Sequence, residues 1–190
     1  MEKRRSLAQY RLVDLALWGV LLFVFESIIL TASVRWFPGQ PYTVSLVPAI
    51  VAVVLVRWGP CAAFHAVLGG LLLCVQSQAS PAQFAVYCIG NLGPLALLPW
   101  LSVWRSRQGV WREALPVLGF GLAVLLLIQT GRALISLLFG ASLPVAAGCY
   151  TTESVTDLFT LVLLWIVRRL DGVLEDQRHY LRRIQEEEET

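Results

Sequence analysis

Charged residues are scarce in this chain of 190 residues: Asp, Glu, Lys and Arg make up only 15% of it, and hydrophobic residues make up 57%. The mean hydropathy is +0.67. Soluble domains usually contain about a quarter charged residues and less than half apolar ones, so this composition excludes an ordinary water-soluble domain. The scarcity of charge predicts a chain embedded in a membrane, with no separate soluble domain.

Metal-binding and catalytic patterns are missing as well. The four cysteines show no CxxC spacing, and His65 is the only histidine within an apolar stretch, so we expect no metal and no cofactor. The chain has no GxSxG, P-loop, HExxH or Gly-rich dinucleotide motif. We therefore expect neither an enzyme nor a transporter driven by an ATPase domain of its own, and no nucleic-acid partner.

The sequence does contain six apolar stretches that resemble transmembrane helices, since a span needs about 20 apolar residues to cross a hydrocarbon layer about 30 Å thick. The second and third are short, and the Gly59-Pro60 pair between them predicts a tight turn. We expect a hairpin of two short helices there, in preference to one irregular re-entrant element. The fold class predicted is an all-α polytopic bundle of six transmembrane helices, at about Leu12–Val34, Tyr42–Val56, Cys61–Val75, Ala82–Val103, Leu115–Phe139 and Cys149–Val167.

Basic residues are distributed unevenly around these stretches. The N-terminus, the turn at Arg57, the loop 105–112 and the tail after Arg168 fall on one side of a six-span bundle, and Arg35 alone falls on the other. Because cytoplasmic loops are enriched in Lys and Arg, we expect a multi-pass protein of the cell membrane with both termini in the cytoplasm.

This interpretation divides the chain into a transmembrane domain, residues 1–170, and a charged cytoplasmic helical tail, residues 171–190. The basic part of the tail would either contact anionic lipid of the bilayer or form a solvated helix end.

Polar residues inside the apolar stretches form the candidate site, because such groups are costly in a bilayer. In one account, Glu26 or Asp157 pairs with Arg132 as a structural ion pair, and Glu153 simply meets water. In the other account, an outward-facing polar cavity with an excess of carboxylates binds a small polar ligand that carries an amine or a cationic ring. The residues expected to line that cavity lie toward the outer ends of four stretches: Glu26, Asn91, Gln129, Arg132, Glu153 and Asp157.

The sequence also shows a family resemblance. The stretch from Val44-Ser45-Leu46-Val47-Pro48 through Arg57-Trp58-Gly59-Pro60 to Gly69-Gly70 resembles a pattern of the substrate-binding S components of energy-coupling factor (ECF) transporters, an apolar helix followed by a Gly-Pro turn and a Gly-rich helix. The chain length and the six short helices resemble that family too. The resemblance implies a vitamin or micronutrient binder with an outward pocket, associated with a transmembrane scaffold subunit and two cytoplasmic ATPases.

Two other functions stay open at this point. One is a structural membrane scaffold similar to MreD-type proteins, which would bind partner proteins and no small ligand. The other is a stand-alone proton-coupled carrier that uses Glu26 and Asp157.

The small residues Gly119 and Ala123 have the spacing of a helix-packing row, which would serve either the bundle itself or a specific partner.

Overall fold

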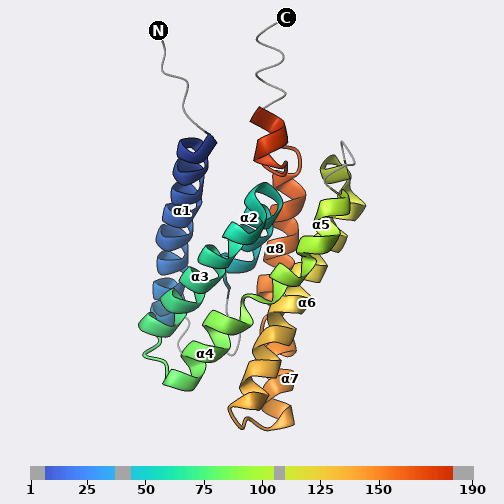
Figure 1. Cartoon of the computed structure of the whole chain (residues 1–190). Coiled ribbons are helices and arrows are strands. Elements are labelled where there is room, and N and C mark those ends of the chain that lie inside the picture. Colours follow the sequence, from blue (N-terminus) through green and yellow to red (C-terminus); the bar gives the residue numbers. More distant parts are fainter. Residues whose placement is uncertain (1–6, 37–43, 105–109, 182–190) are drawn as a thin grey trace, which may run out of the picture.

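The structure is a computed structural model that describes residues 7–36, 44–104 and 110–181. In this part of the chain every regular element is a helix, which confirms the all-α fold class (Figure 1). The longer helices are α1 (Leu7–Trp36), α2 (Val47–Trp58), α3 (Ala62–Gln76), α4 (Pro81–Gly90), α5 (Leu98–Trp104), α6 (Ala114–Leu138), α7 (Leu143–Thr151) and α8 (Ser154–Val167), and the 3₁₀ helices are η1 (Gly59–Cys61), η2 (Gly93–Leu97) and η3 (Val110–Arg112).

The chain has the helices of a membrane-embedded protein. Five stretches of the described residues are long and apolar enough to cross a membrane: Leu7–Ser33, Val47–Gln76, Pro81–Val103, Ala114–Leu138 and Leu143–Val167. Many large apolar side chains on these helices are exposed, including Leu12, Phe23, Leu122 and Leu158, and lipid is the solvent that suits them. The sequence predicts six spans because it divides Val47–Gln76 into two.

The stretch Val47–Gln76 reverses direction between α2 and α3. Gly59, which follows α2, has a φ of +60°, a conformation that glycine adopts without strain. Val47 at the start of α2 lies against Gly69 of α3, whereas a continuous helix rising about 1.5 Å per residue would separate them by about 33 Å. Helices α2 and α3 therefore form the hairpin that the Gly-Pro turn predicts.

Helix α2 is the centre of the bundle. All of its residues are buried, and it packs against α1, α3, α6 and α8. Its valine-rich surface meets Leu22, Phe120 and Leu164 in one apolar core. A helix of this length is only about 18 Å long, which is less than the hydrocarbon thickness. The backbone N–H and C=O groups at its ends must therefore find hydrogen-bond partners inside the protein.

Two of the expected spans are interrupted. The expected span Ala82–Val103 is divided into α4, η2 and α5, with Pro94 at the start of η2, where its missing N–H prevents a regular α-helix. The expected span Cys149–Val167 starts earlier, at Leu143, and is broken after Thr151. There the carbonyl of Gly148 accepts from both the backbone N–H of Thr152 at 3.1 Å and the Thr152 hydroxyl at 2.9 Å, a side-chain bond of the kind that often bends helices.

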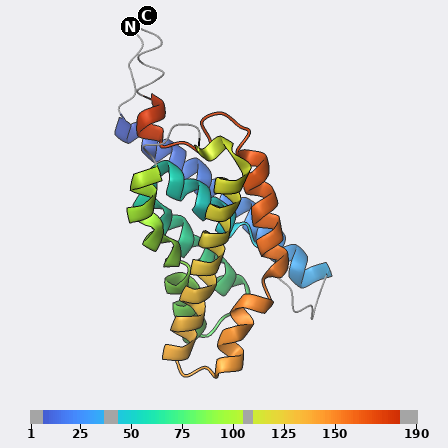
Figure 2. The ribbon, with the colours of Figure 1, turned by 90° about the vertical axis from the view of Figure 1, so that its right-hand side faces the viewer.

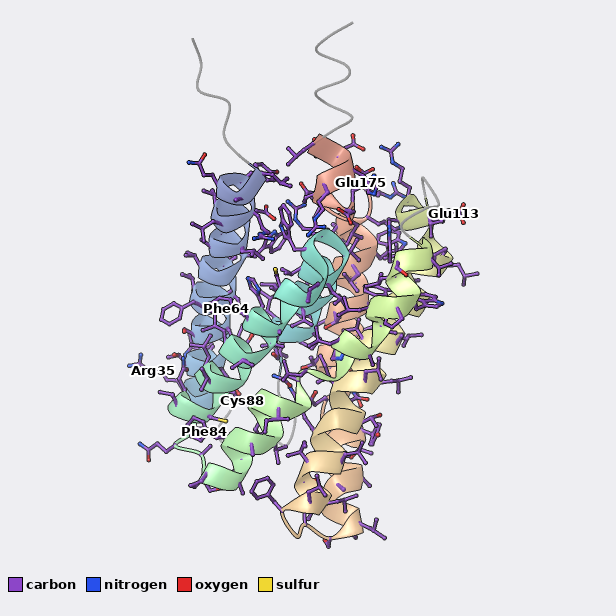
Figure 3. All side chains as sticks on the ribbon, in the orientation of Figure 1. Arg35, Phe64, Phe84, Cys88, Glu113 and Glu175 are labelled. Atoms are coloured by element: carbon purple, nitrogen blue, oxygen red, sulfur yellow. The ribbon has the colours of Figure 1, made fainter. Side chains whose placement is uncertain are left out.

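The described chain begins and ends at the same end of the bundle, which we call the terminal end (Figure 2). Glu113 and Glu175 lie at this end, and Arg35 lies toward the opposite one (Figure 3). The tail does not continue α8 directly: α8 ends at Val167, the chain turns at Gly172 with a φ of +72°, and helix resumes at 177–181. Residues 182–190 of the expected helical tail lie outside the described residues.

Candidate functional site

Four of the six residues that the sequence predicts for the site surround one small cavity: Glu26, Asn91, Arg132 and Glu153. The cavity measures about 20 Å³, which is room for about one water molecule. Its remaining walls are formed by Leu30, Val44, Ser45, Val47, Gly69 and Leu73. The polar residues therefore come from four separate segments of the chain and meet in the half of the bundle away from the terminal end.

Arg132 of α6 is the central group of this site. Its Nε donates to Oδ1 of Asn91 at 2.7 Å, and its Nη1 donates to the carboxylate of Glu153. The guanidinium lies 5.0 Å from the ring centroid of Tyr87, a cation–π distance. Asn91 in turn donates from Nδ2 to the carbonyl of Ala66 at 3.1 Å. These contacts connect α6 to α4, to α3 and to the break between α7 and α8.

Close contact between α4 and α6 brings Asn91 to Arg132. A Cβ atom placed on Gly90 would lie 2.7 Å from Cα of Arg132, and one placed on Gly131 would overlap the carbonyl oxygen of Gly90. A Cβ on Gly93 would likewise overlap the carbonyl oxygen of Leu127. The absence of side chains at these glycines lets the two backbones touch, as in close-packed membrane helices.

Glu26 of α1 faces the cavity from the opposite side. Its carboxylate accepts hydrogen bonds from the Ser45 hydroxyl at 2.8 Å and from the backbone N–H of Leu46 at 2.7 Å. Leu46 is the residue before α2, where backbone N–H groups lack helical partners and favour a negative charge. Within the described residues, Glu26 forms no ion pair.

The other two residues of the predicted site form a pair beside the cavity. Nε2 of Gln129 lies 2.9 Å from each carboxylate oxygen of Asp157, and neither residue lines the cavity. The predicted ion pair of Arg132 with Glu26 or Asp157 is therefore wrong, because Arg132 pairs with Glu153 instead. The break after Thr151 turns Glu153 toward Arg132, and Asp157 faces Gln129 one turn further along α8.

Several contributors to the site were not anticipated from the sequence. Ser45 and Tyr87 contact the charged groups directly, but a serine before a helix and a tyrosine in an apolar stretch are too common to single out. Two other aromatic residues of the apolar stretches lie away from the cavity: Trp18 is near Arg57, and Tyr150 donates to Thr130. His65 is fully buried, with its Nε2 placed 3.1 Å from the carbonyl of Leu15.

A second buried polar cluster lies at the terminal end. Asp14 accepts hydrogen bonds from Arg57 Nε at 3.0 Å, from Arg57 Nη2 at 2.6 Å and from Trp58 Nε1 at 2.6 Å. Nη1 of Arg57 donates to the carbonyls of Gly172 at 2.6 Å and Val173 at 3.1 Å. The sequence marks Arg57 only as a basic turn residue, whereas the structure uses it to connect α1, α2 and the tail.

A larger hollow between α5 and α6 is almost wholly apolar. Its volume is about 620 Å³, and it is lined by Leu97, Trp100, Leu115, Pro116, Gly119, Phe120 and Ala123. A Cβ on Gly119 would meet no atom within 4 Å, so the predicted packing row of Gly119 and Ala123 is not used between helices of this chain. Because its lining is almost wholly apolar, this hollow has the character of a surface that faces lipid.

The polar cavity, by contrast, has the chemistry to recognise a charged small molecule. It combines two carboxylates, Glu26 and Glu153, with one guanidinium. In the part of the chain that the structure describes, Glu153 pairs with that guanidinium and Glu26 has no ion pair. An amine could bind to Glu26, and a carboxylate could bind to Arg132. No group of three metal-ligating side chains occurs in the described residues.

Comparison with protein-family models, with curated proteins and with solved structures found no match for this chain.

Proposed function

We propose that this chain is the substrate-capture subunit of a vitamin or micronutrient importer. Its ligand is a small polar molecule with an amine or a cationic ring, bound at the cavity between Glu26 and Arg132. The observation that carries the proposal is the meeting of buried polar side chains from α1, α4, α6 and the α7–α8 break at one cavity. Ionisable groups at membrane depth are costly and usually mark a ligand or ion site.

Interrupted helices support the same conclusion. Asn91 lies where α4 ends, Glu153 lies between α7 and α8, and Leu46 precedes α2. Non-helical backbone within a membrane is tolerated where it lines a cavity, and transport proteins bind their substrates at such interruptions. Two helix interruptions and the start of a third helix therefore meet at this cavity.

The size of the cavity determines how a ligand binds in this proposal. Because about 20 Å³ holds no more than a water molecule, the ligand must take over hydrogen bonds that the protein now makes internally. Its amine replaces the Ser45 hydroxyl on Glu26, and a carboxylate on the ligand replaces Glu153 on Arg132. Each exchange retains a partner for Glu26 and for Arg132, whereas Glu153, whose side chain is 13% exposed, loses its ion pair and must turn toward water when a ligand carboxylate takes its place.

The proposal includes an orientation in the membrane. The α2–α3 hairpin supplies two of six crossings, the terminal end faces the cytoplasm, and the polar cavity lies toward the outside of a bacterial plasma membrane. The basic residues at the terminal end, among them Arg57, Arg112 and Arg168, support this orientation. A transmembrane scaffold subunit and cytoplasmic ATPases are the proposed partners.

A binding experiment with matched variants tests this function. Purified protein is incubated with a low-mass extract of cells and washed, and retained compounds are identified by mass spectrometry. We expect wild type to retain a polar amine, and Glu26→Gln and Arg132→Lys to retain at least about tenfold less, as for the loss of a charge-assisted bond. Arg112→Lys, far from the cavity, is the control. A wild type that retains nothing, or variants that retain as much as wild type, would refute the proposal.

A structural scaffold is the second candidate, because the polar cluster is satisfied internally and nearly fills its space. That function predicts co-purifying membrane proteins, no retained small molecule, and an effect of Arg132→Lys on thermal stability alone. The third possibility, a proton-coupled carrier, has less support, since Asp157 does not line the cavity that Glu26 lines.

A further inference from the structure

Helix α1 forms one wall of the polar cavity and lies at the edge of the bundle (Figure 1). It supplies Glu26 to the cavity and packs mainly against α3 and α2. Along its outer side, large apolar side chains are exposed: Leu12, Val13, Leu17, Val20, Phe23, Val24 and Ile28. With this much of its surface outside the contacts with the protein, α1 can move without breaking an extensive packed interface.

Polar contacts attach α1 to the rest of the protein near both ends. At the cavity, Glu26 accepts hydrogen bonds from Ser45 and Leu46. Near the terminal end, Asp14 is bound by Arg57 and Trp58. Asp14 and Glu26 are about 18 Å apart along the helix axis at 1.5 Å per residue, so a tilt of α1 by about 10° displaces these two side chains by about 3 Å relative to one another.

The C-terminal tail holds the Asp14 end of α1 in place. The positive φ of Gly172 turns the chain back over the bundle, where Leu174 and Gln177 are buried. The carbonyl of Gly172 accepts from both Arg57 Nη1 at 2.6 Å and Gln177 Nε2 at 2.8 Å. The hydroxyl of Tyr10, on α1, donates to Oε1 of Gln177 at 3.2 Å.

We propose that residues 172–177 are a strap that keeps the polar cavity closed by fixing the terminal end of α1. The strap acts on α1 by two routes, directly through Tyr10 and indirectly through Arg57, whose guanidinium binds Asp14 on one side and the strap carbonyls on the other. When the strap is released, α1 tilts and Glu26 moves away from Ser45 and Leu46. The inference rests on the proposed function only for the identification of this cavity as the ligand site.

Thiol labelling of the cavity tests the strap without any ligand. The reporter is Leu30→Cys, at a buried position of the cavity wall, in a full chain whose four native cysteines are replaced by serine or alanine. The reagent is methanethiosulfonate ethyltrimethylammonium, a small cation that enters from water. We compare the full chain, a chain ended after Asp171 that lacks the strap, and a chain ended after Leu181 that retains it.

We expect the chain without the strap to label at least about fivefold faster than the full chain, as for the loss of a hydrogen bond that holds a closed state. The chain ended after Leu181 should label at the full-chain rate. Tyr10→Phe removes only the hydroxyl that binds Gln177, so we expect about a twofold increase in rate; this variant decides the matter if the shorter chain does not fold. A reporter at the exposed Ser142 should label equally in all variants.

The proposal would be overturned if Leu30→Cys were labelled at the same rate in the full chain, in the chain without the strap and in Tyr10→Phe. Faster labelling of both reporters would indicate general loosening and would overturn it as well. The result is independent of whether a ligand exists. If labelling is faster without the strap but the purified protein retains no small molecule, the proposed function is refuted and this inference stands.

Discussion

At the level of single residues, the buried pair of Asp14 and Arg57 connects three separate segments, α1, α2 and the tail. Their side chains are only 12% and 8% exposed, and the carboxylate accepts three hydrogen bonds. Removing one partner of such a pair leaves the other charge buried without compensation, which costs more than the intact pair contributes.

Arg57→Ala is therefore expected to lower the free energy of unfolding by about 3–5 kcal/mol. The matched control is Arg112→Ala, because the Arg112–Asp171 ion pair has side chains that are 65% and 81% exposed, and exposed pairs contribute about 0–1 kcal/mol. Denaturant titration in detergent, followed by tryptophan fluorescence, measures both variants. Similar losses for the two would contradict a structural role specific to Arg57.

The residues of the polar cavity could be selected from the sequence for a physical reason, namely the cost of ionisable and amide groups inside apolar stretches. That rule picks out Glu26, Asn91, Arg132 and Glu153, which the structure brings together. It does not tell which carboxylate meets Arg132, because the pairing depends on where the helix between Thr151 and Ser154 breaks. Their role in binding stays a prediction.

Asp14 was overlooked for a related reason. It lies near the start of the first apolar stretch, where a charge is ordinary because water and lipid headgroups are close. Only the fold shows that the α2–α3 turn and the tail cover it.

Among the elements, the crossing of α4 and α6 positions the site most directly. Gly90 and Gly131 meet there without side chains, and Arg132 is the next residue along α6. Any added methyl group must push the two backbones apart and so move Asn91 relative to Arg132.

Gly90→Ala and Gly131→Ala should each destabilise the protein by about 1–3 kcal/mol through overpacking. Gly119→Ala is the control on the same helix as Gly131: nothing lies within 4 Å of its added Cβ, so the higher helix propensity of alanine should leave stability unchanged or raise it by up to about 1 kcal/mol. Thermal unfolding in detergent distinguishes the two classes. A loss at Gly119 as large as at Gly131 would show that the described crossing is not what these glycines serve.

The helix interruptions were only partly foreseeable. Pro94 indicates a bend in the expected span Ala82–Val103, but it does not predict that Asn91 would end α4 and leave the ladder. The break after Thr151 has a weaker signal still, because threonine hydroxyls bond to carbonyls within intact helices as well. The Gly59-Pro60 turn, in contrast, combines two strong local preferences, and the chain does reverse there.

At the scale of the whole molecule, the hairpin determines the topology. If α2 and α3 each cross the membrane, the loops at Ser80 and Ser142 lie on the same side and the terminal end lies on the other. If the hairpin instead turned back within the membrane and left it on the side where it entered, the Gly59-Pro60 turn would not reach the side of the terminal end.

Cysteine labelling in intact cells distinguishes these arrangements. In a chain without its native cysteines, Ser80→Cys and Ser142→Cys, both at exposed positions, should react with a membrane-impermeant maleimide added outside. Pro60→Cys, exposed at the α2–α3 turn, should react only after the cells are permeabilised. Reaction of Pro60→Cys from outside, or protection of Ser80→Cys and Ser142→Cys, would contradict six crossings with both termini in the cytoplasm.

The all-helical, membrane-embedded character of the chain follows from composition alone, because apolar stretches of this length leave few alternatives. The arrangement around α2 does not, since every apolar stretch looks equally suited to face lipid or protein. Burial of all of α2 becomes visible only when its neighbours α1, α3, α6 and α8 are placed around it.

The most direct test of ligand capture is an experimental density map of the protein purified from its own membranes. We predict non-protein density between Glu26 and Arg132, in contact with both side chains, in a cavity larger than the present 20 Å³. Glu153 should then have moved away from Arg132 where the ligand carries a carboxylate. A map with Arg132 still bound to Glu153, Glu26 still bound to Ser45, and at most one water between them would contradict the account.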